Sequence, residues 1–162
     1  LTIIIPRHIE RTESIIEELK KLDLIIHKHN SKEKINKNTD VYIINSYGRT
    51  KSIYNICKNV FLGGSIINHG GQNPLEATRY GCNILHGPNI ENFEEIYKYL
   101  SKLNLSVKIN NTSQLRSKLD EFLSKKNNSK KIKIKLKKIG KEILNNTYNN
   151  IDRFLKHENY KA

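Results

Sequence analysis

The 162-residue sequence contains no methionine, no tryptophan, only three prolines and only two cysteines. The chain starts abruptly with an apolar run at residues 1–5, and without a methionine we expect it to be a piece of a longer protein. The apolar run is too short for a signal peptide and leads directly into Pro6 and Arg7. No apolar stretch approaches the roughly 20 residues that a membrane-spanning helix needs. These absences predict a soluble fragment.

The scarcity of cysteine limits both redox and metal chemistry. Cys57 and Cys82 lie in hydrophobic segments and lack metal-ligand spacing. We predict that both are buried free thiols in a reducing compartment. No Asp-x-Asp metal motif is present, so we expect no metal site and no cofactor.

The chain has few acidic residues, 16 against 29 Lys and Arg, which gives a net charge of +13. Such a charge can indicate a nucleic-acid-binding module, or it can follow from a composition rich in Lys, Asn and Ile. The basic residues are spread along the sequence, apart from a dense cluster at 125–138, and no recognised nucleic-acid motif accompanies them. We therefore expect no nucleic-acid partner, and keep the basic module as an alternative.

Short apolar segments alternate with helical patterns along the chain. The predicted strands are residues 2–5, 24–27, 41–44, 59–62, 82–85 and 105–109. The predicted helices are residues 9–22, 49–58, 74–80, 92–103 and 113–123, with one or two Lys-rich helices at about 129–157. This alternation predicts the α/β class, a Rossmann-like parallel sheet of about six strands with helices on both faces. We divide the chain into a domain at 1–128 and a Lys-rich helical segment at 129–162.

The strongest functional signal follows the fourth predicted strand. It consists of Gly63-Gly64-Ser65 and, after three residues, His69-Gly70-Gly71-Gln72-Asn73-Pro74-Leu75-Glu76. Glycines let a backbone approach a ligand closely, and the amides of such a loop can bind a phosphate. A carboxylate at Glu76 can accept two hydrogen bonds from a ribose diol. A tight turn alone would also use glycine, but so many polar residues and glycines together favour binding over stability.

This block resembles the donor-binding motif of the bacterial Kdo (3-deoxy-D-manno-oct-2-ulosonic acid) transferases of lipopolysaccharide synthesis. Pro6-Arg7-His8 and Gly87-Pro88 followed by Asn92-Phe93 also match, so the resemblance covers about residues 3–95. It implies the C-terminal half of a GT-B glycosyltransferase, with CMP-Kdo as donor and a lipid A precursor as acceptor. It also implies that the full-length protein works at the cytoplasmic face of the inner membrane.

The resemblance carries specific roles over to this sequence. Asn73 and Glu76 would hold the cytidine ribose, and Arg7 would place a cation beside the departing CMP. The residues that would line the phosphate and the sugar are Gly64, Ser65, His69, Gly70 and Gly71. The family's general base is a Glu of the N-terminal domain, so we expect no catalytic residue in this fragment. We expect the fragment alone to bind cytidine nucleotides weakly and to transfer nothing.

The loop at residues 45–50 departs from the family pattern. The family usually has Asp-Thr-Met-Gly-Glu-Leu, whereas this chain has Asn45-Ser46-Tyr47-Gly48-Arg49-Thr50. The Gly48 amide can still meet a phosphate, so Gly48 belongs to the predicted donor-binding residues. Arg49 replaces the Glu and can pair with phosphate instead. Gln72, often His in the family, keeps the hydrogen-bonding capacity.

Two alternatives stay open for the function. For the C-terminal segment, two alternatives stay open for its apolar face and two for its basic cluster. A GT-B transferase or epimerase that uses a UDP-sugar would carry a similar loop and Glu, and the basic nucleic-acid-binding module remains the alternative of a different class. An apolar face recurs at helical spacing in the C-terminal segment, at Ile143, Leu144, Tyr148, Ile151, Phe154 and Leu155. This face can pack on the missing N-terminal domain or on the chain's own sheet. The cluster at 125–138 can contact an anionic membrane surface or form a solvated face.

Overall fold

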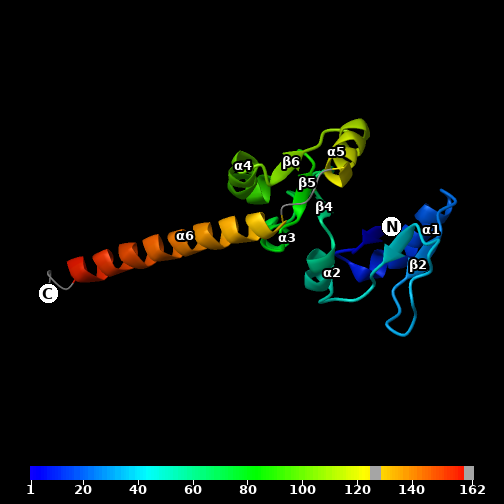
Figure 1. The fold of residues 1–162 in the computed structure, drawn as a ribbon, viewed down its shortest axis with the longest axis horizontal. Helices are drawn as coiled ribbons and strands as arrows, with labels where there is room; N and C mark the ends of the chain where they lie inside the picture. The colour runs from blue at the N-terminus through cyan, green and yellow to red at the C-terminus, as the bar shows by residue number, and fades with distance from the viewer. Residues whose placement is uncertain (125–128, 159–162) are drawn as a thin grey trace. The chain divides into compact units, whose positions relative to one another are not determined.

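A computed structural model of the chain describes residues 1–124 and 129–158 (Figure 1). The chain divides into two compact units, Leu1–Ile53 (unit 1) and Tyr54–Ala162 (unit 2). Each unit has its own parallel sheet and its own hydrophobic core. We therefore describe each unit by itself.

Unit 1 is built on a three-stranded parallel sheet. Its strands are β1 (Thr2–Ile4), β2 (Ile26–Lys28) and β3 (Val41–Ile43), in the order β1-β3-β2. The central strand β3 is buried along its whole length, as expected for a parallel strand with neighbours on both edges. A 3-10 turn, η1 (Ile9–Arg11), and α1 (Thr12–Lys20) follow β1. Ile16 of α1 packs on β3, so the apolar face of this helix closes the core.

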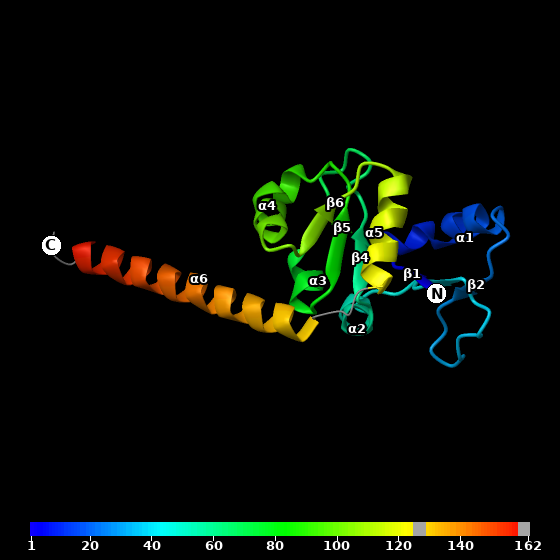
Figure 2. The same cartoon turned by 45° about the horizontal axis from the view of Figure 1, so that its top comes forward.

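Unit 2 contains a second three-stranded parallel sheet, which carries the predicted site. Its strands are β4 (Asn59–Leu62), β5 (Asn83–His86) and β6 (Ser106–Lys108), in the order β4-β5-β6. The helices are α3 (Leu75–Arg79), α4 (Glu94–Lys102, preceded by the 3-10 turn η2 at Glu91–Phe93) and α5 (Thr112–Ser124). In both Figure 1 and Figure 2, α3 and α4 lie on one side of the sheet and α5 on the other. Helix α2 (Thr50–Ile56) spans the boundary between the units.

The ends of two helices follow the local sequence. Gly81 ends α3 in a left-handed conformation, with φ of +77°, and its N–H donates to the carbonyl of Thr78 at 2.8 Å. The Asn111 side chain accepts the N–H of Gln114 at 2.9 Å before the second turn of α5. The Gln114 side chain accepts the N–H of Asn110 at 2.9 Å in return. Gly81 therefore ends α3, and Asn111 caps the start of α5.

The α/β class and the parallel strands flanked by helices are confirmed, and each of the six predicted strand segments overlaps an observed strand. A single six-stranded sheet is not confirmed, because the strands pair in two sets of three. β1 and β4 are each an edge strand of their own sheet. The predicted domain boundary at 128/129 stays a prediction, and residues 125–128 lie outside the described residues.

The Lys-rich segment forms one continuous helix, α6 (Ser129–Glu158), over its described part. It contacts α3, and the Lys133 ammonium lies 5.9 Å from the centre of the Tyr80 ring. The predicted apolar face is half or more exposed at every position, Ile143, Leu144, Tyr148, Ile151, Phe154 and Leu155. Within unit 2 this face therefore does not pack on the sheet β4-β5-β6, and its packing on the missing N-terminal domain stays a prediction. Within residues 1–124 and 129–158, no helix combines the length and the hydropathy needed to span a bilayer.

Both cysteines are free thiols. Cys82 is completely buried, and its thiol donates to the carbonyls of Cys57 and Tyr54 at 3.3 and 3.4 Å. Burial raises the pKa of Cys82 to about 11 and also raises the pKa of Cys57. The prediction of a buried thiol is confirmed for Cys82, whereas Cys57 is only partly buried. A thiol held protonated is a poor nucleophile, so neither cysteine is suited to covalent catalysis.

Candidate functional site

The glycine-rich segment forms a closed loop directly after β4. Gly64 adopts a left-handed conformation, with φ of +69°, and turns the chain away from the strand. The N–H of Gly71 donates to the carbonyl of Gly64 at 3.0 Å, which joins the two ends of the loop. Between them, His69 is exposed, and its N–H donates to the carbonyl of Ile67 at 2.8 Å. The loop therefore has a defined shape before any ligand binds.

Ser65 fastens this loop to the loop that follows β5. Its side chain is fully buried, and the hydroxyl donates to the carbonyl of Leu62 at 2.6 Å. The same hydroxyl accepts the N–H of Gly87 at 2.8 Å, and the Ser65 carbonyl accepts the N–H of Asn89 at 2.9 Å. These bonds engage the hydroxyl inside the protein, so its first role is to position the loop. A direct contact with a ligand stays a prediction.

Two glycines are required by close contacts between the same two loops. A Cβ at Gly87 would lie 2.1 Å from the carbonyl oxygen of Ser65, so no larger residue fits there without moving the backbone. A Cβ at Gly70 would lie 2.2 Å from the side-chain nitrogen of Asn92, at a φ of +71°. The N–H of Asn92 also donates to the carbonyl of Gly70 at 3.3 Å. These contacts thus join the loops after β4 and β5 firmly to each other.

The start of α3 presents two polar side chains beside this loop. The Asn73 side-chain oxygen accepts the N–H of Leu75 at 2.9 Å, which leaves the amide NH₂ of Asn73 as its remaining donor. Glu76 is half-buried, and its carboxylate makes no hydrogen bond or ion pair with any residue that the structure describes. Its charge acts on the Tyr54 hydroxyl, and its oxygens stay available to accept hydrogen bonds from a diol.

The buried side chains of His86 and Tyr97 hydrogen-bond to the backbone of the two loops, and neither residue was predicted from the sequence. The rings of His86, at the end of β5, and Tyr97, on α4, have their centres 4.2 Å apart. Tyr97 donates to the carbonyl of Gln72 at 2.9 Å, and His86 donates to the carbonyl of Gly87 at 2.7 Å. Burial lowers the pKa of His86 and raises that of Tyr97, so both side chains are neutral at pH 7. The match at Gly87-Pro88 followed by Asn92-Phe93 was the signal in the sequence that pointed to this region.

The other two predicted residues belong to unit 1. Arg7 is exposed just beyond β1, and Gly48, with φ of +77°, lies beyond β3. β1 and β3 are neighbouring parallel strands, and the N–H of Ile44 donates to the carbonyl of Ile4 at 2.9 Å where the pair ends. The loops that carry Arg7 and Gly48 therefore both leave the sheet at the carboxyl ends of its strands. The Arg7 guanidinium has no hydrogen-bond or ion-pair partner among the described residues.

All nine predicted residues thus lie in segments that follow the carboxyl ends of parallel strands, where ligands bind in sheets of this type. Unit 1 contributes Arg7 and Gly48, and unit 2 contributes Gly64, Ser65, His69, Gly70, Gly71, Asn73 and Glu76. In the described parts of the chain, no three His, Cys, Asp or Glu side chains gather as they would around a metal ion.

Comparison with known proteins gives consistent matches. No protein-family model matches the chain. The chain is 31% identical over 155 residues to a 3-deoxy-D-manno-octulosonic acid transferase of Haemophilus influenzae, a match that covers 96% of this chain and 36% of that protein. It is 33% identical over 135 residues to the enzyme of the same name from Aquifex aeolicus, covering 83% of this chain and 36% of that protein. The chain therefore spans about a third of the length of these relatives.

A solved structure with a similar fold is the C-terminal CMP-Kdo binding domain of WaaA from Acinetobacter baumannii. The TM-score is 0.75 and the sequence identity 26%, and the match covers 85% of this chain and 72% of that one. The sequence matches and the structural match each extend over most of the chain. They agree, because the relatives and the solved domain are all named for Kdo.

Proposed function

Because the chain belongs to the Kdo transferase family, as a segment corresponding to part of its C-terminal domain, we propose that it binds the donor CMP-Kdo. The full-length protein then transfers Kdo from CMP-Kdo to a lipid A precursor in lipopolysaccharide synthesis. It does so at the cytoplasmic face of the inner membrane. The observation that carries this proposal is the unpartnered Glu76 carboxylate beside the interlocked glycine loop.

The site in unit 2 offers a complementary group for each part of the nucleotide. The Glu76 carboxylate accepts hydrogen bonds from the ribose hydroxyls, and the Asn73 amide donates to the same sugar. The N–H groups of Gly64 and Gly70 have no acceptor in the described part of the chain. Unpaired backbone donors in a rigid loop are suited to phosphate oxygens, because no reorganisation is needed when the anion binds. The exposed His69 completes the phosphate and sugar side, and Ser65 holds the loop in position.

The chemical contribution of this chain is to stabilise the leaving group. When the bond from Kdo to phosphate breaks, negative charge grows on the departing CMP. Preorganised N–H donors of the unit 2 loop stabilise that charge. Roles for Arg7 and Gly48 of unit 1 at the phosphate stay predictions from the family resemblance. The acceptor hydroxyl loses its proton to a base outside these 162 residues, so the chain alone binds the nucleotide without transferring Kdo.

Calorimetric titration of the 162-residue chain with CMP, UMP and UDP tests this proposal. We expect CMP to bind, and Glu76→Gln to weaken it about tenfold, because a neutral amide accepts fewer hydrogen bonds from the diol. Glu95→Gln is the matched control, since Glu95 is an exposed carboxylate on α4 and its loss changes the net charge equally. CMP affinity unchanged by Glu76→Gln would contradict the proposed ribose contact. Tighter binding of UDP than of CMP would instead favour the UDP-sugar alternative.

A further inference from the structure

Unit 1 contains a cavity of its own, lined in part by the loop at residues 45–50 that also carries Gly48 of the predicted nucleotide-binding set. Its volume is about 650 Å³, and it lies beyond the carboxyl ends of β2 and β3. The residues of its wall that matter here are His29, Glu33, Asn45, Ser46 and Arg49. In parallel sheets with helical crossovers, ligands bind at this end of the strands.

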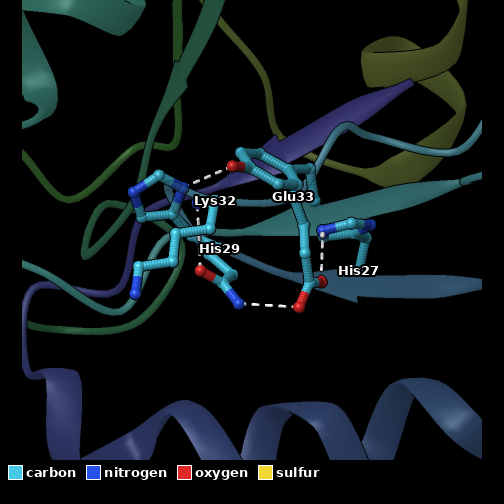
Figure 3. Close-up of polar contacts among 6 residues, drawn as sticks. His27, His29, Lys32 and Glu33 are labelled. Atoms are coloured by element: carbon cyan, nitrogen blue, oxygen red, sulfur yellow. Dashed lines mark hydrogen bonds and ion pairs between the residues drawn. The ribbon is translucent and has the colours of Figure 1, made fainter.

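His29 is held in a defined orientation by Tyr42 (Figure 3). Its Nδ1 and the Tyr42 hydroxyl form a hydrogen bond, and the two rings meet edge to face with centres 5.7 Å apart. A phenol is a stronger acid than a neutral imidazole, so Tyr42 donates to Nδ1. Neutral His29 then carries its own proton on Nε2, the ring nitrogen that does not bond Tyr42. His29 therefore presents an N–H donor whether it is neutral or protonated.

The carboxylates around the cavity already have partners. Glu33 accepts a hydrogen bond from the Asn30 side chain at 2.7 Å, and its other oxygen lies 3.9 Å from Nε2 of His27 (Figure 3). Glu13 on α1 pairs with Lys28. These contacts neutralise Lys28 and occupy both acids. The acceptors near the cavity are thus engaged with neighbours rather than with the cavity's remaining donors.

Arg49 and Ser46 supply further donors to the wall. The exposed Arg49 guanidinium makes no hydrogen bond or ion pair within residues 1–124 and 129–158. The Ser46 hydroxyl is shielded from solvent and also has no hydrogen-bond partner among the described residues. A buried hydroxyl without a partner is unfavourable, and it becomes satisfied if it rotates toward a bound acceptor. The wall therefore combines one unpaired cation, one oriented imidazole N–H and one unsatisfied hydroxyl.

We propose that this cavity binds a small oxyanion, a phosphate monoester or a carboxylate, through Arg49, His29 and Ser46. The guanidinium supplies two parallel N–H donors to the two oxygens, and the other two side chains donate at the sides. None of these three residues belongs to the proposed nucleotide-binding set. The oxyanion has two possible sources: it is either a group of the bound donor or a separate anion, and the experiment distinguishes these sources.

Side-chain NMR of the ¹⁵N-labelled 162-residue chain, titrated with inorganic phosphate and separately with CMP, tests this site. We expect phosphate to shift the Nε–Hε signal of Arg49 and the ring signals of His29 in a saturable manner. Saturable shifts of these signals by CMP, with an apparent affinity for CMP that falls when phosphate is present, would assign the oxyanion to the donor. Shifts by phosphate alone would assign a separate anion. No saturable shift with either probe overturns the proposal.

Three variants separate a specific site from general attraction by a basic protein. We expect Arg49→Gln to weaken phosphate binding at least tenfold. Arg49→Lys should restore part of it, because lysine keeps the charge but not the fork. Arg116→Gln on α5 removes an exposed Arg elsewhere and should leave binding unchanged. Equal loss in Arg49→Gln and Arg116→Gln overturns the proposal. Failure of the nucleotide site is distinguishable, because it would appear in the loop amides of unit 2 and not in Arg49.

Discussion

The strand-end loops of the two units use the same kinds of residue in opposite ways. In unit 2 the Ser65 hydroxyl has two partners, and the loops after β4 and β5 hold each other in place. In unit 1 the Ser46 hydroxyl has no partner in the described chain, and Arg49 is equally unpaired. Where side chains fix the shape of a loop, backbone N–H groups and Glu76 are the groups that we propose recognise the ligand. Where they stay unpaired, the side chains themselves are the available donors.

The largest effect should come from breaking the interlocked loops of unit 2. Gly87→Ala forces a Cβ to within 2.1 Å of the Ser65 carbonyl oxygen, and we expect it to destabilise unit 2 by about 3 kcal/mol or more. Gly140→Ala is the control, because nothing lies within 4 Å of a Cβ there and α6 should gain about 0.5–1 kcal/mol. Chemical denaturation measures both changes. A Gly87→Ala variant as stable as the parent would show that the two loops are not rigidly joined.

A pair of serine substitutions sharpens the comparison between the units. Ser65→Ala leaves the N–H of Gly87 and the carbonyl of Leu62 without their partner, so we expect a loss of about 1–3 kcal/mol. Ser46→Ala removes a hydroxyl that has no described partner, so stability should stay the same or rise slightly. Denaturant midpoints of the two variants provide the measurement. Equal losses at both positions would refute the contrast drawn here.

The smallest effect concerns the pH dependence of unit 2. Burial lowers the pKa of His86 in the folded protein below its ordinary value of about 6.5. Between these two pKa values the unfolded chain binds a proton that the folded chain does not. Stability therefore rises with pH in this window and is lost as pH falls below about 6.5. We expect His86→Phe, which keeps a ring against Tyr97, to reduce the slope of unfolding free energy against pH between 5 and 7. An unchanged slope would exclude His86 as its source.

Much of the secondary structure could be predicted from the sequence, because buried parallel strands and amphipathic helices leave strong local patterns. β4 was predicted at residues 59–62 and is observed at Asn59–Leu62. The caps at Gly81 and Asn111 follow from short-range chemistry. The site block was predicted for the same reason, since its glycines and Glu76 are close in sequence.

The strand pairing and the contacts that support the site could not be predicted, because local sequence does not encode them. Which strands pair decides whether six strands form one sheet or two, and a strand's own residues do not specify its neighbour. The contact of Gly87 with Ser65 joins positions 22 residues apart. The stack of His86 on Tyr97 likewise joins a strand to a later helix. These long-range contacts support the site, and they became visible only in the folded structure.

Backbone amide chemical-shift mapping with CMP tests the central claim most directly. If the block at residues 63–76 holds the nucleotide, CMP should shift the amides of Gly64, Gly70 and the first residues of α3, and Glu76→Gln should weaken the response. Saturable CMP shifts confined to other parts of the chain, with these amides unmoved, would contradict the account.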